Sequence, residues 1–233
     1  MRQSTNKAKQ QQKRPLVTAW NPKSMTSEAY RSLRTNLQYS MIDQKIHTMM
    51  VTSSGPGEGK STTAANLAVT YAQSGQKVLL VDGDLRRPTV HYTFQLSNAW
   101  GLSHVLSQQS TWKKVVQRSE VEHLDIMTSG QIPPNPAEML ASKRLDALID
   151  ELKSTYEIII FDSPPALALT DAQLLAAKCD GTLLVIESGR MKRDVVLKVK
   201  ENLEHVKARI LGVVLNNVKK NGKDQYYYYY ESS

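Results

Sequence analysis

The sequence predicts a three-layer α/β domain in which helices cover both faces of a mainly parallel sheet. Short apolar segments recur along the chain, and a longer segment with helical spacing follows them. Several of the short segments are continuously apolar, as expected for strands buried on both faces of a parallel sheet. Such alternation is typical of a doubly wound fold with right-handed crossovers. The expected strands are 48–52, 77–81, 123–127, 157–161, 182–186 and 210–215.

The helical segments follow from the same periodicity. Helices are expected at about 27–40, 60–74, 137–153, 170–177 and 191–207. The length of 233 residues suits one such domain with a sizeable core. We therefore divide the chain into a basic, disordered leader (1–20), a folded domain (21–218) and a flexible tail (219–233).

The net charge of +8 comes mostly from the leader. Residues 1–14 contribute +5, the residues from 219 onward +1, and the folded part only about +2. A nearly neutral folded part argues against nucleic-acid binding. Cys179 is the only cysteine, which excludes an internal disulfide and a thiolate metal cluster. With no long apolar stretch and no hydrophobic signal region, we expect a cytoplasmic chain that reaches a membrane only through a partner.

A phosphate-binding loop is predicted where the expected strand 48–52 meets the expected helix 60–74. A Gly-rich loop and Gly-Lys-Ser at a helix start turn backbone N–H groups and the helix dipole toward phosphate oxygens. Lys60 is expected to reach the outer phosphates of ATP, and Ser61 to coordinate Mg²⁺. The general pattern has glycine where this chain has Ser54, so the loop is a variant. The predicted phosphate-binding residues are Ser53, Gly55, Gly57, Glu58, Gly59, Lys60, Ser61 and Thr62.

Three aspartates follow expected strands that end at the same sheet edge. Asp82 and Asp84 come after 77–81, and Asp162 comes after 157–161. A lone aspartate at such a position often caps a helix. Three beside a phosphate loop favour phosphoryl transfer, with Lys60, Asp82 and Asp84 catalytic. The predicted Mg²⁺ ligands are Ser61, Asp84 and Asp162.

Two neighbouring arginines and two neighbouring asparagines remain ambiguous in the sequence. Arg86 and Arg87 are either surface charges or groups that grip phosphate or an acidic segment. Asn216 and Asn217, just past the last expected strand, are candidates for an adenine contact, and a turn role fits them equally well.

Five consecutive tyrosines lie in the expected tail: Tyr226, Tyr227, Tyr228, Tyr229 and Tyr230. A strand or helix at a polar terminus could bury only some of them, so they suit a substrate segment better than a core. We expect all five to be autophosphorylation sites. If the last strand is parallel to the others, the tail leaves the domain at the edge that carries the aspartates. The eight residues from Val218 to Tyr226 span at most about 26–29 Å, a reach that fits the site of a neighbouring copy or the chain's own site.

The chain resembles the bacterial protein-tyrosine kinases. The resemblance rests on the phosphate loop, the tyrosine cluster and two aspartate-containing segments, Asp82-Gly83-Asp84-Leu85-Arg86-Arg87-Pro88 and Asp162-Ser163-Pro164-Pro165. The likeness is to the stand-alone cytoplasmic kinase subunit of Firmicutes. It implies a P-loop NTPase fold of the deviant-Walker type and an ATP- and Mg²⁺-dependent kinase. The implied acceptors are its own tyrosine cluster, phosphorylated in trans, and other proteins that regulate capsular or extracellular polysaccharide synthesis.

The resemblance also implies partners. These are a separate transmembrane activator that recruits the kinase to the inner face of the membrane, and a cognate phosphotyrosine phosphatase. Glu28, Arg31 and Arg34 recur at three-residue spacing, which alone indicates a solvated helix face. In the family this pattern forms the contact of a ring, with an octamer as precedent.

Two other functions fit part of the sequence. A regulatory ATPase switch of the partition or division-site type shares the nucleotide motifs, but such proteins use a second lysine early in the loop and lack a tyrosine tail. An adaptor phosphorylated by another kinase would not need the phosphate- and metal-binding set.

Overall fold

The computed structural model describes residues 16–39, 46–167 and 169–218. Residues 1–15 of the predicted leader and all of the predicted tail lie outside these ranges. The predicted autophosphorylation sites therefore lie outside the described residues as well, namely Tyr226, Tyr227, Tyr228, Tyr229 and Tyr230. The predictions made for these segments stay predictions.

A seven-stranded sheet runs through the described part of the chain in the order β3-β4-β2-β5-β1-β6-β7. All neighbouring strands are parallel except β3, which pairs antiparallel with β4 at one edge. β1, β2 and β5 are buried along their whole length because helices cover both faces. The strands are β1 (Thr48–Ser53), β2 (Val78–Asp82), β3 (Val116–Arg118), β4 (Leu124–Met127), β5 (Ile158–Asp162), β6 (Gly181–Glu187) and β7 (Ile210–Asn216).

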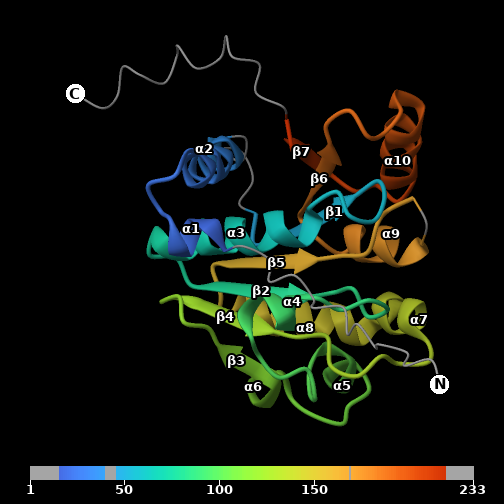
Figure 1. The fold of residues 1–233 in the computed structure, drawn as a ribbon. Coiled ribbons are helices and arrows are strands. Elements are labelled where there is room, and N and C mark those ends of the chain that lie inside the picture. Colours follow the sequence, from blue (N-terminus) through green and yellow to red (C-terminus); the bar gives the residue numbers. More distant parts are fainter. Residues whose placement is uncertain (1–15, 40–45, 168, 219–233) are drawn as a thin grey trace, which may run out of the picture.

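The helices form two layers with separate apolar cores (Figure 1). One core lies under α3 (Lys60–Gln73), with α1 (Val17–Trp20), α2 (Met25–Tyr39) and α4 (Val90–Phe94) around it. The other core lies under α5 (Leu102–Leu106), α6 (Trp112–Val115), α7 (Pro136–Ala141), α8 (Lys143–Lys153), α9 (Thr170–Ala176) and α10 (Arg193–His205). The predicted three-layer, mainly parallel α/β fold is confirmed. No helix in the described ranges is long and apolar enough to cross a bilayer.

The expected elements agree with the structure except at a few points. The expected helix 137–153 is divided at Ser142, whose extended backbone (φ −68°, ψ 150°) ends α7 and starts α8. Strand β3 and the short helices α4, α5 and α6 were not predicted, because segments of three to five residues carry little periodicity.

Residues 16–20 belong to the folded domain, although we assigned them to the leader. The N–H and hydroxyl of Thr18 donate to the side-chain oxygen of Asn66 on α3 at 3.0 and 2.8 Å. Leu16 and Thr18 are buried. The ordered domain therefore begins earlier than the predicted boundary at residue 21.

Candidate active site

The phosphate loop connects β1 to α3, as predicted. Gly57 and Gly59 have left-handed backbones (φ 81° and 96°), which other residues adopt only with strain. At Gly59 a Cβ would lie 2.0 Å from Nδ2 of Asn216. Only glycine therefore fits directly before Lys60, the first residue of α3.

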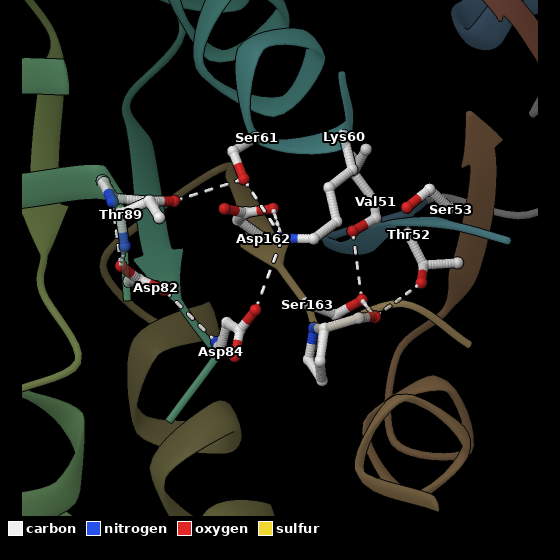
Figure 2. Close-up of polar contacts among 12 residues, drawn as sticks. Val51, Thr52, Ser53, Lys60, Ser61, Asp82, Asp84, Thr89, Asp162 and Ser163 are labelled. Atoms are coloured by element: carbon white, nitrogen blue, oxygen red, sulfur yellow. Dashed lines mark hydrogen bonds and ion pairs between the residues drawn. The ribbon is translucent and has the colours of Figure 1, made fainter. Parts of the chain in front are cut away.

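Lys60 joins the phosphate loop to two of the predicted aspartates (Figure 2). Its Nζ donates to Ser61 Oγ at 3.1 Å and to Asp162 Oδ1 at 3.3 Å, and it lies 3.5 Å from Asp84 Oδ2. Both carboxylates are almost fully buried. Oxygens of Ser61, Asp84 and Asp162 thus gather around the Lys60 ammonium.

These oxygens fit a magnesium ion by their chemistry. Mg²⁺ prefers oxygen ligands and usually combines one or two carboxylates with substrate phosphates and waters. Within the described residues no group of three or more His, Cys, Asp or Glu side chains could hold a metal. A metal beside these residues would therefore depend on the Ser61 hydroxyl and on phosphate oxygens, as in other phosphate-loop proteins.

A cavity of about 280 Å³ opens beside Lys60. Five of the predicted phosphate-binding residues line it: Gly57, Gly59, Lys60, Ser61 and Thr62. Its other lining residues are Pro56, Asp84, Arg87, Thr89 and Pro165. The Thr89 hydroxyl also donates to Ser61 Oγ at 3.3 Å, a contact that no sequence motif indicated.

The remaining predicted phosphate residues shape the loop and do not line the cavity. The Ser53 hydroxyl donates to the carbonyl of Gly55 at 2.7 Å, and the Gly55 N–H donates to the carboxylate of Glu58 at 2.6 Å. Glu58 is 1% exposed, and burial raises the pKa of its carboxyl. These three residues close the loop upon itself and so hold its backbone in place.

Asp82 and Asp84 occupy different surroundings. Asp82 accepts hydrogen bonds from the N–H groups of Thr89 and Val90, both at 2.9 Å, and from Asp84 N–H at 3.2 Å. Burial, and next the neighbouring Asp162, raise the pKa of Asp82 to about 7. Asp82 thus binds the start of α4, the capping role that a strand-end aspartate often takes, whereas Asp84 lines the cavity.

Arg86 and Arg87 likewise have different surroundings. Arg86 donates two hydrogen bonds to the buried Asp171 of α9, at 2.7 and 3.1 Å. Arg87 lines the cavity instead. Arg86 therefore connects the loop after β2 to α9, and Arg87 is placed to meet a phosphate.

The two asparagines after β7 lie close to the phosphate loop. Nδ2 of Asn216 donates to the carbonyl of Glu58 at 2.9 Å, and Asn217 donates to Glu187 at 3.1 Å. Arg190, after β6, pairs with Glu187 at 2.6 Å and packs against Gly57. These residues brace the loop from outside. An adenine contact of Asn216 and Asn217 stays a prediction.

The predicted oligomer residues lie on α2. Arg31 and Glu28 form an exposed ion pair at 2.6 Å. Arg34 instead donates to the carbonyl of Thr70 on α3 at 2.7 Å. Glu28 and Arg31 thus lie at the surface, where Arg31 also donates to the carbonyl of Pro22 at 2.8 Å, while Arg34 ties α2 to α3.

The fold and this site define a phosphate-loop nucleotide-binding protein of the α/β class. A family model described as an AAA domain matches residues 46–216. The septum site-determining protein MinD of Pyrococcus horikoshii, solved with Mg-ADP, is 25% identical with a TM-score of 0.65, covering 76% of this chain and 72% of that one.

Kinases are more similar. The tyrosine-protein kinase YwqD of Bacillus subtilis is 48% identical over 93% of this chain and 91% of its own length. The kinase domain of the Escherichia coli tyrosine kinase ETK is 36% identical with a TM-score of 0.86, covering 89% of this chain and 82% of that one. The chain belongs to the bacterial tyrosine-protein kinases, as the sequence predicted.

Proposed function

We propose that this chain transfers the γ-phosphoryl group of ATP to tyrosine hydroxyls, with Tyr226–Tyr230 of a neighbouring copy among the acceptors. The observation that carries the proposal is the position of the Lys60 ammonium. It contacts Ser61, Asp84 and Asp162 beside a cavity at the carboxyl edge of the sheet. Ligands bind at this edge in open α/β sheets.

The phosphate groups are assigned to the loop and its cationic neighbours. The N–H groups at the start of α3 and the Lys60 ammonium neutralise phosphate charge, and Arg87 extends this positive surface. Mg²⁺, held by Ser61 and Asp162 with Asp84 left free to accept a proton, would supply further neutralisation of the transferring group. The phosphoryl group then needs mainly positioning and charge stabilisation, both of which these residues provide.

Asp84 is the residue that we assign to the tyrosine proton. It reaches the cavity, whereas the Asp82 carboxylate is engaged by three backbone N–H groups. Asp82 acts through Asp84, because it accepts the N–H of that residue and fixes the loop between β2 and α4. A general base must first lie within reach of the proton that it accepts, and only then does its pKa matter. The raised pKa of Asp82 therefore does not by itself make Asp82 the base.

Delivery of the tyrosines follows from the last strand. β7 is parallel to β6, and its final residue, Asn216, contacts the phosphate loop. The chain therefore reaches the catalytic edge at the point where the tail starts. We propose a ring of copies, joined through the α2 face of Glu28, Arg31 and Arg34, in which each tail enters the neighbouring site.

Partners and location are proposed from the family. The resemblance of this chain to kinase subunits that work with a separate membrane activator supports recruitment to the inner face of the membrane. It also supports reversal by a phosphotyrosine phosphatase and a role in the synthesis of capsular or extracellular polysaccharide. Each phosphotyrosine adds about −1.5 to −2 charges, so a fully modified tail would be repelled from a packed ring.

The test is phosphotyrosine formation by the purified chain with Mg²⁺-ATP and the activator's cytoplasmic segment. Lys60→Met should abolish the signal, and Phe at all five tail positions should remove autophosphorylation while leaving transfer to another protein. Persistent labelling of Lys60→Met would show that the nucleotide site is wrongly assigned.

The two aspartates are tested by a matched pair. Asp84→Asn should abolish transfer, whereas Asp82→Asn should leave a measurable rate with a similar pH profile. The reverse pattern would make Asp82 the proton acceptor. For the ring, Glu28→Ala with Arg31→Ala should lower the mass measured by light scattering without lowering the unfolding midpoint. An unchanged mass would contradict the interface.

A further inference from the structure

The outer edge of β7 is an unprotected strand edge in the described part of the protein. β7 ends the strand order and pairs only with β6 there. Its seven residues, Ile-Leu-Gly-Val-Val-Leu-Asn, include no charge and no proline. Proteins usually protect such edges with charges, prolines or a covering segment, because free N–H and C=O groups recruit another strand.

Large apolar side chains surround this edge. Val213 is 52% exposed, Leu215 62% and Val218 56%. In the β6–β7 register, Val213 and Leu215 lie opposite Leu184 and Ile186, which belong to the core under α10. The exposed pair therefore continues that apolar layer onto the last strand of the sheet. An edge of this kind fits an added β-strand.

We propose that the occupant is the chain's own tyrosine segment, residues 223–230, which pairs antiparallel with β7 as an eighth strand. Between β7 and the tyrosines the sequence contains Asn221-Gly222. This dipeptide favours a two-residue hairpin turn, because both residues accept left-handed backbones. The turn reverses the chain directly beside the edge it has just left.

The hairpin register matches the two segments. With Asn221 and Gly222 as the turn residues, Lys219 lies opposite Asp224, an attractive pair. Val213 then lies opposite Tyr230, Leu215 opposite Tyr228, and Asn216 opposite Tyr227. Tyrosine favours strands and has both an apolar ring and a polar hydroxyl. A half-wet edge strand can therefore use tyrosine on both of its faces, which accounts for an unbroken run of five.

The docked segment has a consequence for phosphorylation, and this part rests on the proposed function. Tyrosines paired along β7 of their own subunit are held out of a neighbour's cavity. Docking and transfer therefore compete for the same residues, and the free edge of β7 limits how readily the tail becomes a substrate.

Disulfide trapping tests the docking without reference to kinase activity. In a Cys179→Ser background, Val213→Cys is combined with Tyr230→Cys, and Leu215→Cys with Tyr228→Cys. Because Asn217 has a left-handed backbone (φ 53°), a one-residue slip is covered by Val213→Cys with Tyr229→Cys. The matched control is Arg118→Cys with Tyr230→Cys, which places the partner cysteine on β3 at the opposite edge.

We expect mild oxidation to give an intramolecular disulfide in at least one β7 pair, visible as a faster band on a non-reducing gel, and none in the control. Replacing the turn residues by Asn221→Pro and Gly222→Val should abolish formation of this intramolecular disulfide. Equal trapping at β3, no trapping, or only disulfide-linked dimers would overturn the proposal. The last result would assign the edge to a second copy. Unchanged circular dichroism of each variant excludes misfolding as the cause.

Discussion

Substitution of the two neighbouring arginines, Arg86 and Arg87, separates the structural contribution of the loop after β2 from the chemical one. Arg86→Ala leaves the Asp171 carboxylate, which is 1% exposed, without its two-hydrogen-bond partner. Removing one member of a fully buried ion pair costs about 3–5 kcal/mol. Arg86 is 40% exposed, so solvent screening reduces the expected loss to about 2 kcal/mol.

Urea unfolding followed by circular dichroism measures this loss. With a slope of about 2 kcal/mol per molar urea, the midpoint should fall by about 1 M. Adding Asp171→Asn should restore part of the loss, because no buried charge is then left unpaired. Arg87→Ala should change the free energy of unfolding by less than about 0.5 kcal/mol while reducing phosphate transfer. An unchanged midpoint for Arg86→Ala, or equal losses for both variants, would refute the assignment.

Three further predictions concern other parts of the fold. Gly59→Ala should abolish binding of a fluorescent ATP analogue, because the added Cβ would collide with Asn216. The control is Gly75→Ala, at φ 86° with open space around it. This variant should bind the analogue normally and lose only about 1–2 kcal/mol of stability. Asn66→Ala should cost about 1–3 kcal/mol in urea unfolding and speed hydrogen exchange in α1, because the buried Thr18 loses its acceptor; unchanged exchange would contradict the anchoring role. Burial raises the pKa of Tyr71 to about 12, so the neutral phenol is favoured in the fold and stability should fall as pH rises from 10 to 12; Tyr71→Phe should flatten this decline in unfolding curves measured at each pH.

Much of the fold could be predicted because its strands are buried on both faces. Segments such as 158–161 are continuously apolar, so sequence and burial coincide. The Gly-Lys-Ser sequence at the start of α3 also located the phosphate site. There the residues that bind phosphate are the same residues that form the turn into the helix. By contrast, α1 is anchored by side chains far along the chain, because Asn66 accepts two hydrogen bonds from Thr18 and Gln73 donates to the carbonyl of Thr18. No local pattern records these contacts.

The distinctions within the site could not be predicted. Arg86 and Arg87 are chemically identical, and only the position of Asp171 on α9 decides which one forms an ion pair. Likewise the roles of Asp82 and Asp84 differ because the start of α4 donates hydrogen bonds to Asp82. Helix α4 is too short to be predicted from the sequence. Sequence motifs identify the members of the site, whereas tertiary contacts assign their roles.

The pairing of β2 with β5 places Asp82 directly beside Asp162. Their spacing is set by a ladder of backbone hydrogen bonds in the middle of the sheet, and not by the loops that follow. The two carboxylates therefore keep their spacing when the sequence of those loops changes. For engineering, the segment from Gln95 to Trp100 can be diversified while Thr89 and Val90 are kept, because both hold Asp82 and Thr89 also contacts Ser61.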